Sequence, residues 1–212
     1  MPTQADSAPQ YVELELESVL LRVGDHVGVF YRGDEERNAF VMPLVATALA
    51  ADCGVIVVCD RDEPEEVAKQ LTDLAIDSAG ALGRGQIRLV PSTDAYLAGG
   101  VFEPDRVVEF YQRAWRESRR RGYPVLCVIG EMSWSLRDCP GTERLLEYEA
   151  RYAHEFETTP AITLCLYDLQ QTSGDQILDL LRLHRRVVLN GIEIQNPHID
   201  PGFFLGSSAG GG

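Results

Sequence analysis

The first turn between a strand and a helix in this chain, within residues 27–37, is strongly acidic. In nucleotide-binding α/β proteins such a turn holds phosphate, using glycines for close backbone approach, a lysine for the β/γ-phosphates and Ser or Thr for Mg²⁺. Here it carries Asp34, Glu35 and Glu36, and the single lysine of the chain, Lys69, lies far downstream. Three carboxylates at a helix N-terminus satisfy the helix dipole and repel phosphate. The sequence therefore predicts that this turn does not bind phosphate.

Aromatic and acidic side chains follow the carboxyl ends of the predicted strands. Ligands of open α/β sheets bind in the crevice beyond those ends. This rule selects a set of candidate ligand-binding residues: Tyr31, Arg32, Asp34, Tyr96, Glu131, Met132, Trp134, Tyr167 and Asp168. Aromatic faces and carboxylates suit a small apolar or cationic ligand. The alternative is that the aromatic residues are part of the core and the acids are solvated loop residues.

No catalytic constellation is evident. The apolar run 125–129 leads through Gly130 to Glu131, which is the pattern of a magnesium-holding acid, but the partner Lys and Ser/Thr are missing. The nucleophile motif Gly-x-Ser-x-Gly is absent, and no histidine falls in the predicted crevice. His26 begins a strand at the opposite end of the sheet, and His184, on an apolar helix face, is typical of a structural histidine. We predict no enzymatic activity and no cofactor.

The cysteines and histidines do not form a metal-binding motif. There are five cysteines and no Cys-x-x-Cys pair, and Cys59, Cys127 and Cys165 fall in or at the ends of apolar strands, as buried, reduced cysteines do. The four histidines are scattered along the chain: His26, His154, His184 and His198. Structural metal sites have tightly spaced ligands. The sequence predicts no metal site.

Strands and helices alternate through most of the chain. Strands are expected at 26–31, 55–59, 86–90, 125–129 and 162–167, with a final strand or hairpin at 187–194. Helices are expected over 34–51, from Pro64, over 104–121, from Thr142, and after a capping box at 173–176. Residues 12–16 alternate like an edge strand, and 19–21 could begin a short helix. This alternation predicts an α/β fold in three layers, a mainly parallel sheet flanked by helices, with 125–129 as its central strand.

Composition and charge restrict the partners. The 212 residues are 45% apolar and 25% charged, with a net charge of −14, which argues against nucleic-acid or acidic-membrane binding. No apolar run approaches the ~20 residues of a membrane span, and no signal-peptide pattern is present, so we expect a cytoplasmic protein. We expect one domain over 11–205, with a flexible N-terminus over 1–10 and a Gly/Ser-rich tail over 206–212.

Five short motifs together resemble the MEDS family, the methanogen/methylotroph DcmR sensory domain. They are His26-Val27 with Phe30-Tyr31, Gly130-Glu131-Met132-Ser133-Trp134, Tyr148-Glu149, Cys165-Leu166-Tyr167-Asp168, and the late His184. The similarity spans roughly residues 24–197. It implies a RecA/KaiC-like fold without the phosphate-binding loop, in regulators proposed to sense small hydrocarbon-derived molecules. Family members are often joined to a DNA-binding, histidine-kinase or anti-sigma-type ATPase domain.

These observations lead to three functional hypotheses. The first is a non-enzymatic sensory domain that binds a small organic molecule at the strand-end crevice and signals to a regulatory partner or fused output domain. The second is a degenerate nucleotide-binding protein of KaiC/RecA type. The third is a protein-interaction module, such as an anti-sigma-type partner, in which the crevice is empty. A homodimer is compatible with all three.

Overall fold

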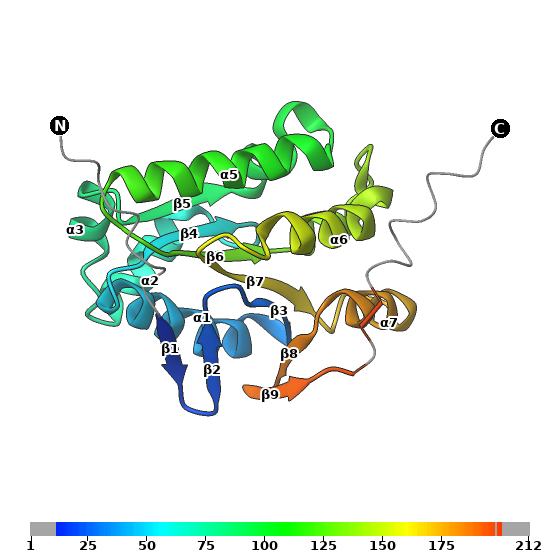
Figure 1. Cartoon of the computed structure of the whole chain (residues 1–212), viewed down its shortest axis with the longest axis horizontal. Coiled ribbons are helices and arrows are strands. Elements are labelled where there is room, and N and C mark those ends of the chain that lie inside the picture. The colour runs from blue at the N-terminus through cyan, green and yellow to red at the C-terminus, as the bar shows by residue number, and fades with distance from the viewer. Residues whose placement is uncertain (1–11, 198, 201–212) are drawn as a thin grey trace.

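The computed structural model describes residues 12–197, 199 and 200, and its core is a seven-stranded sheet between two layers of helices (Figure 1). The strand order is β5-β4-β6-β7-β3-β8-β9, and every neighbouring pair is parallel except β8 and β9. The strands are β3 (His26–Tyr31), β4 (Gly54–Cys59), β5 (Ile87–Pro91), β6 (Leu126–Glu131), β7 (Ala161–Asp168), β8 (Arg186–Leu189) and β9 (Ile192–Gln195). The predicted three-layer α/β fold is confirmed. The termini predicted over 1–10 and 206–212 lie outside the described residues.

One face of the sheet is covered by α1 (Gly33–Ala50), α2 (Pro64–Asp73) and α3 (Ser78–Gly83). A hairpin of β1 (Glu13–Leu16) and β2 (Val19–Arg22) packs against α1 as a separate two-stranded sheet. Alternate residues of the inner strands, such as Val27, Val29 and Tyr31 of β3, enter the core on this face. Such alternation follows from the two-residue repeat of a strand.

The other face is covered by α5 (Pro104–Arg120), α6 (Leu145–Phe156) and α7 (Gly174–Leu183) (Figure 1). Short segments α4 (Ser92–Ala95), η1 (Ala98–Gly100), η2 (Ser133–Leu136) and η3 (Thr142–Arg144) connect these elements at the strand ends. The core on this face is rich in aromatic residues and includes Phe30, Trp134 and Tyr167. Parallel strands buried on both faces explain the nearly continuous apolar runs in the sequence.

Most element boundaries agree with the predictions to within a few residues. The predicted strand at 26–31 is observed as β3, and the capping box is present, with Ser173 Oγ accepting from the Gln176 N–H and the Gln176 side chain accepting from the Ser173 N–H. Three expectations needed correction. Residues 19–22 form strand β2 rather than a helix, because they complete a hairpin with β1. The helix expected from Thr142 begins as the short 3-10 helix η3, which α6 follows. The strand expected to be central, 125–129, is β6, and it lies next to the middle strand β7.

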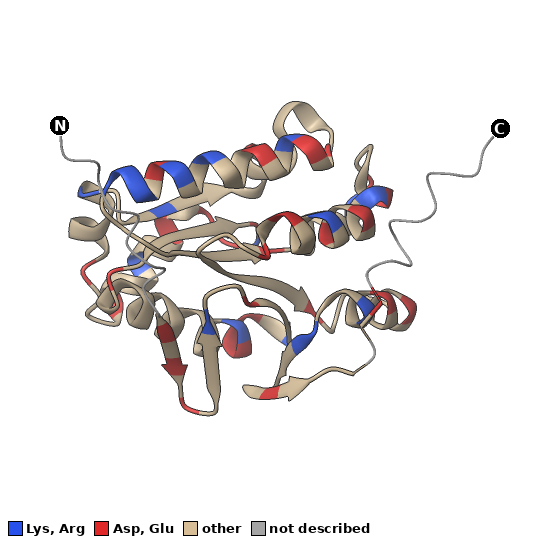
Figure 2. Ribbon diagram, in the orientation of Figure 1, with Lys and Arg blue, Asp and Glu red and all other residues tan. Residues whose placement is uncertain are grey.

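The surface is acidic overall but not segregated by sign. Acidic and basic residues are interspersed along α5 and α6 (Figure 2). In the described part of the chain, no helix has the length and apolar character needed to cross a membrane.

Candidate functional site

The first turn of α1 ends in a buried arginine. Asp34, Glu35 and Glu36 occupy this turn, and Arg37 follows with only 3% of its surface exposed. Arg37 Nη1 donates to Glu131 Oε1 at 2.6 Å, and Nη2 donates to Asp62 Oδ2 at 2.5 Å. A buried guanidinium needs such partners, because an unpaired charge in the core is very costly.

Glu131, at the end of β6, is held from two sides. Its Oε1 pairs with Arg37, and its Oε2 accepts backbone N–H groups of Asp60 (2.5 Å) and Arg61 (2.8 Å) in the loop after β4. Burial raises the pKa of Glu131, while Arg37 and the two N–H groups oppose that shift. Burial also disfavours the charged Arg37, but Glu131 and Asp62 outweigh it and raise the pKa of Arg37. The pair is an internally neutralised salt bridge.

Asp168 extends this arrangement to the end of β7. Arg61 bridges two acids, with Nε 2.7 Å from Asp34 Oδ1 and Nη1 3.2 Å from Asp168 Oδ2. Asp168 Oδ1 also accepts the Gln170 N–H at 2.9 Å. We call the connected residues the charged network: Asp34, Arg37, Asp60, Arg61, Asp62, Glu131 and Asp168. It lies at the carboxyl ends of β3, β4, β6 and β7, where a phosphate-binding loop would bind its ligand.

The predicted aromatic residues lie in the core rather than in an open crevice. Trp134 is fully buried, stacks on Tyr96 with ring centres 4.6 Å apart, and also contacts Phe102 at 4.6 Å. The Tyr96 hydroxyl is 2.7 Å from that of Tyr111. Met132 and Tyr167 are buried in the same core. Tyr96 and Trp134 are therefore core residues, as the alternative interpretation of the sequence proposed.

A small pocket of about 150 Å³ lies beyond the carboxyl ends of β6 and β7. Three of the predicted ligand-binding residues line it, Met132, Tyr167 and Asp168. The rest of its wall comes from η2, η3, α6, α7 and the turn before α7: Ser133, Ser135, Leu136, Thr142, Glu143, Leu145, Leu146, Thr172, Gln176 and Leu180. We call this the strand-end pocket. Its wall is mostly apolar with polar groups at intervals, as in small-molecule sites.

Tyr31, Arg32 and Asp34 do not line the strand-end pocket, and Asp34 belongs to the charged network. Tyr31 is buried and borders a second pocket of about 480 Å³ beneath the β1–β2 hairpin, together with Glu36 and Phe40. Exposed Arg32 donates to Asn190 Oδ1 at 2.8 Å. Eight of the nine predicted residues are thus divided among the core, the charged network and two pockets, and Arg32 is exposed outside all of them.

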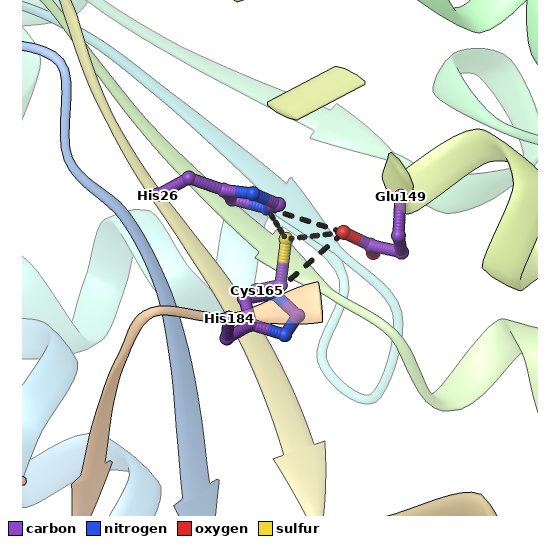
Figure 3. Close-up of side chains that lie close together, drawn as sticks. All are labelled: His26, Glu149, Cys165 and His184. Atoms are coloured by element: carbon purple, nitrogen blue, oxygen red, sulfur yellow. Dashed lines mark hydrogen bonds and ion pairs between the residues drawn. The ribbon is translucent and has the colours of Figure 1, made fainter. Parts of the chain in front are cut away.

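A separate group of titratable side chains, three of them buried and one partly buried, lies between the sheet and α6. His26 of β3, Glu149 of α6, Cys165 of β7 and His184 after α7 converge there (Figure 3). One ligand atom from each residue lies within 4.8 Å of the other three. We call this the buried cluster. The expectation that the histidines are scattered is wrong for His26 and His184, whose ring centres are 4.5 Å apart, and His198 lies outside the described residues.

The contacts within the buried cluster centre on one oxygen. Glu149 Oε2 lies 3.1 Å from His26 Nε2, 3.6 Å from Cys165 Sγ and 3.7 Å from His184 Nε2. His26 Nε2 also lies 3.3 Å from Cys165 Sγ. The second oxygen, Oε1, accepts the Tyr167 hydroxyl at 2.8 Å. Burial opposes the charge of Glu149, but His26, His184 and Tyr167 outweigh it and lower the pKa of the carboxyl group.

This geometry does not fit a Cys-His-Glu catalytic triad. A triad histidine uses one ring nitrogen for the nucleophile and the other for the orienting acid, whereas His26 Nε2 faces both Cys165 and Glu149. Burial and the Glu149 carboxylate also raise the pKa of the Cys165 thiol, which keeps it protonated. The cluster is better suited to binding than to nucleophilic attack.

Two signals in the sequence could have revealed these groups. Arg37 lies four residues before Val41, on the apolar stripe of α1, so a buried charge was implied there. Glu149 lies within the apolar stripe of α6, beside Tyr148 and four residues after Leu145. A charged residue on a core-facing helix stripe requires a partner, but the identity of that partner depends on the fold.

A family profile described as "MEthanogen/methylotroph, DcmR Sensory domain" matches residues 25–185, most of the chain. The chain belongs to the MEDS family. All four residues of the buried cluster and the whole charged network fall within the matched MEDS region. The family is a sensory one.

A curated relative of this MEDS chain is a transcriptional regulator. The chain is 25% identical over 185 residues to the transcriptional repressor DcmR of Methylorubrum extorquens (strain DSM 6343 / CIP 106787 / DM4), an alignment that covers 84% of the chain. The same alignment covers 65% of the repressor, so the chain spans just under two thirds of that relative's length.

Solved structures confirm the RecA/P-loop-like fold of the MEDS chain. The KaiC-like protein PH0186 from Pyrococcus horikoshii OT3 superposes with a TM-score of 0.58 and 14% identity, covering 79% of the chain and 71% of PH0186. The flagellar accessory protein FlaH from Methanocaldococcus jannaschii gives a TM-score of 0.57 and 11% identity, covering 87% and 84%. At these identities, the likeness extends to the fold alone.

Proposed function

We propose that this MEDS chain is a non-enzymatic sensory domain that binds a small organic molecule in the strand-end pocket and signals to a regulatory partner or fused output domain. The observation that carries the proposal is a pocket of about 150 Å³ beyond β6 and β7, next to a phosphate position that an ion pair occupies. Arg37 and Glu131 neutralise each other where the scaffold would bind nucleotide.

The pocket has a size and lining that suit a small, mostly apolar ligand. A cavity of about 150 Å³ is enough to hold a molecule the size of benzene. Leu145, Leu146 and Leu180 offer apolar contact, while Ser135 and Gln176 offer hydrogen-bonding groups at its wall. Small alcohols, amines and haloalkanes are therefore the first compounds to test.

The pocket also has a physical link to the charged network. Asp168 belongs to both, and Ser133 of the pocket wall donates its hydroxyl to Asp60 Oδ2 at 2.6 Å. A ligand that favours one arrangement of these side chains would shift the position of the loop after β4 and of α1. That shift is the signal we propose a partner reads. The transcriptional repressor among the relatives supports a regulatory output of this kind.

A thermal-shift screen with matched tryptophan variants tests the proposal. A ligand at a hundredfold excess over its Kd stabilises the native state by ~2.7 kcal/mol, which raises Tm by about 5 °C or more for a chain of this size. Leu146→Trp fills the strand-end pocket and should abolish the shift. Leu178→Trp adds the same side chain at an exposed position of α7 and should leave the shift intact.

A third variant tests whether the ligand binds instead in the second pocket, beneath the β1–β2 hairpin. Ala39→Trp fills the pocket beneath the β1–β2 hairpin and should not alter the shift. A shift lost in Ala39→Trp but kept in Leu146→Trp would place the ligand beneath the hairpin and overturn the proposed site. Failure of every small organic compound to stabilise the wild type would favour a protein-interaction module.

A further inference from the structure

We propose that the buried cluster of His26, Glu149, Cys165 and His184 is a binding site for one divalent transition-metal ion, with zinc as the best match. The inference is independent of the strand-end pocket and goes beyond the proposed sensory function. It rests on the distances between donor atoms, on the orientation of the His184 imidazole, on the charge balance and on the space that β3 leaves for His184.

The donor atoms are spaced like the corners of a tetrahedron. Zinc binds nitrogen, oxygen and sulfur at ~2.0 to 2.3 Å, so neighbouring ligand atoms around a tetrahedral ion lie about 3.3 to 3.8 Å apart. Four of the six distances in the cluster are 3.1, 3.3, 3.6 and 3.7 Å. The other two, from His184 to His26 and to Cys165, are at most 4.8 Å. Small side-chain shifts would complete the tetrahedron.

His184 has the orientation of a metal ligand. Its Nδ1 lies 2.9 Å from the Leu180 carbonyl oxygen, so Nδ1 carries the proton and Nε2 presents a lone pair. That Nε2 faces the cluster, is completely buried and makes no hydrogen bond in the described part of the chain. Metal-binding histidines characteristically donate their other nitrogen to a backbone carbonyl or carboxylate. Glu149 is also oriented by a neighbour, because its Oε1 accepts a hydrogen bond from the Tyr167 hydroxyl.

The charge balance of the cluster favours a cation. Glu149 is 0% exposed, and its contacts are two imidazoles, a thiol and a phenol, none of which has the permanent charge of Arg or Lys. A buried carboxylate is stable when a cation or several hydrogen bonds compensate it. On binding, the Cys165 thiol would lose its proton to solvent and form a thiolate–metal bond.

Space for the fourth ligand is provided by β3. A Cβ atom at Gly28 would lie 3.0 Å from Cγ and 3.3 Å from Nδ1 of His184, so the glycine allows the imidazole to lie directly against the strand. The donor set of two nitrogens, one thiolate and one carboxylate is typical of zinc and also accepts cobalt.

Metal titration of the stripped protein tests the site. After dialysis against a chelator, Zn²⁺ should bind with one ion per chain by elemental analysis and should raise Tm. Co²⁺ should give the intense visible absorption of tetrahedral coordination and a near-ultraviolet thiolate-to-cobalt band. Absence of stoichiometric zinc and cobalt binding in the wild type would overturn the proposal.

Two substitutions and a matched control identify the ligands. Cys165→Ser should abolish the thiolate band and weaken zinc binding at least ~100-fold, whereas Cys127→Ser, equally buried in the neighbouring strand β6, should change neither. Tyr167→Phe keeps the ring and should weaken binding about 10- to 100-fold through loss of its support for Glu149. Equal metal binding by the Cys165 and Cys127 variants would mean that the cluster is a hydrogen-bonded polar core only. If Cys165→Ser fails to fold, the wild-type cobalt spectrum still decides.

Discussion

At the scale of single residues, the Arg37–Glu131 pair fills part of the strand-end region with internal contacts. A buried arginine that already has two carboxylate partners is not available to an incoming phosphate. The acid at the end of β6 is equally engaged, because its two oxygens accept the guanidinium and two backbone N–H groups. The polar groups of the pair are therefore satisfied by contacts within the chain.

Removal of one partner from this pair should be strongly destabilising. Arg37→Met leaves Glu131 as an uncompensated buried charge, and we expect a loss of about 3–5 kcal/mol in the free energy of unfolding, measured with urea. The double variant Arg37→Met/Glu131→Gln should lose less than the single variant, because the remaining side chain is neutral. Arg22→Met breaks an exposed pair with Glu13 and should cost less than ~1 kcal/mol. Additive losses in the double variant would contradict the coupling.

At the scale of elements, the position of β3 in the sheet brings the residues of the buried cluster together. It lies between β7 and β8, with Gly28 opposite Cys165 on one side and Val187 on the other. The absence of a side chain at Gly28 lets His184 reach the face on which His26 and Cys165 lie. The buried cluster therefore depends on β3, β7, α6 and the segment after α7 together, and no single element contains it.

An added methyl group should reveal this close packing. Gly28→Ala places a Cβ at 3.0 Å from His184, and we expect a loss of ~1–3 kcal/mol in urea-measured stability because the imidazole must move. Gly174→Ala, at the start of α7, meets nothing within 4 Å and should be neutral or stabilise by up to ~1 kcal/mol. Equal effects at the two positions would show that the Gly28 contact is not tight.

At the scale of the whole molecule, the chain combines a nucleotide-binder's topology with an acidic surface and an internally paired strand-end region. The solved structures that share its fold include a KaiC-like protein, yet the net charge of −14 and the acidic start of α1 disfavour anionic ligands. Fold and ligand preference are separable, because ligands contact the loops at the strand ends rather than the sheet itself.

Calorimetry with ATP and Mg²⁺ tests this separation. We expect no saturable binding at nucleotide concentrations up to about 1 mM, the level that corresponds to a binding free energy of ~4 kcal/mol. The triple variant Asp34→Asn/Glu35→Gln/Glu36→Gln removes the repulsion from the first turn and should still not bind, because Arg37 remains paired with Glu131. Micromolar affinity in the wild type would revive the nucleotide-binding alternative, and binding only in the variant would assign the exclusion to surface charge.

The sequence by itself determined the layers of this protein and the chemistry missing from its first turn. Strand β3, the helix begun by Pro64 and the capping box at Ser173 follow from local patterns of apolarity, Pro and Ser, which act over a few residues. The lack of a phosphate-binding loop can also be recognised from a short stretch of sequence, the turn after β3. These features could be predicted because neighbouring residues alone specify them.

The tertiary structure alone decided which distant side chains meet. Trp134 and Tyr96 proved to be stacked in the core, Arg37 met Glu131 across 94 residues of sequence, and His26 met Cys165 across 139. Strand order sets such pairings, since residues on adjacent parallel strands become neighbours whatever their separation along the chain. The order that places β3 between β7 and β8 is a property of the packed sheet, so the buried cluster emerges only once the sheet is assembled.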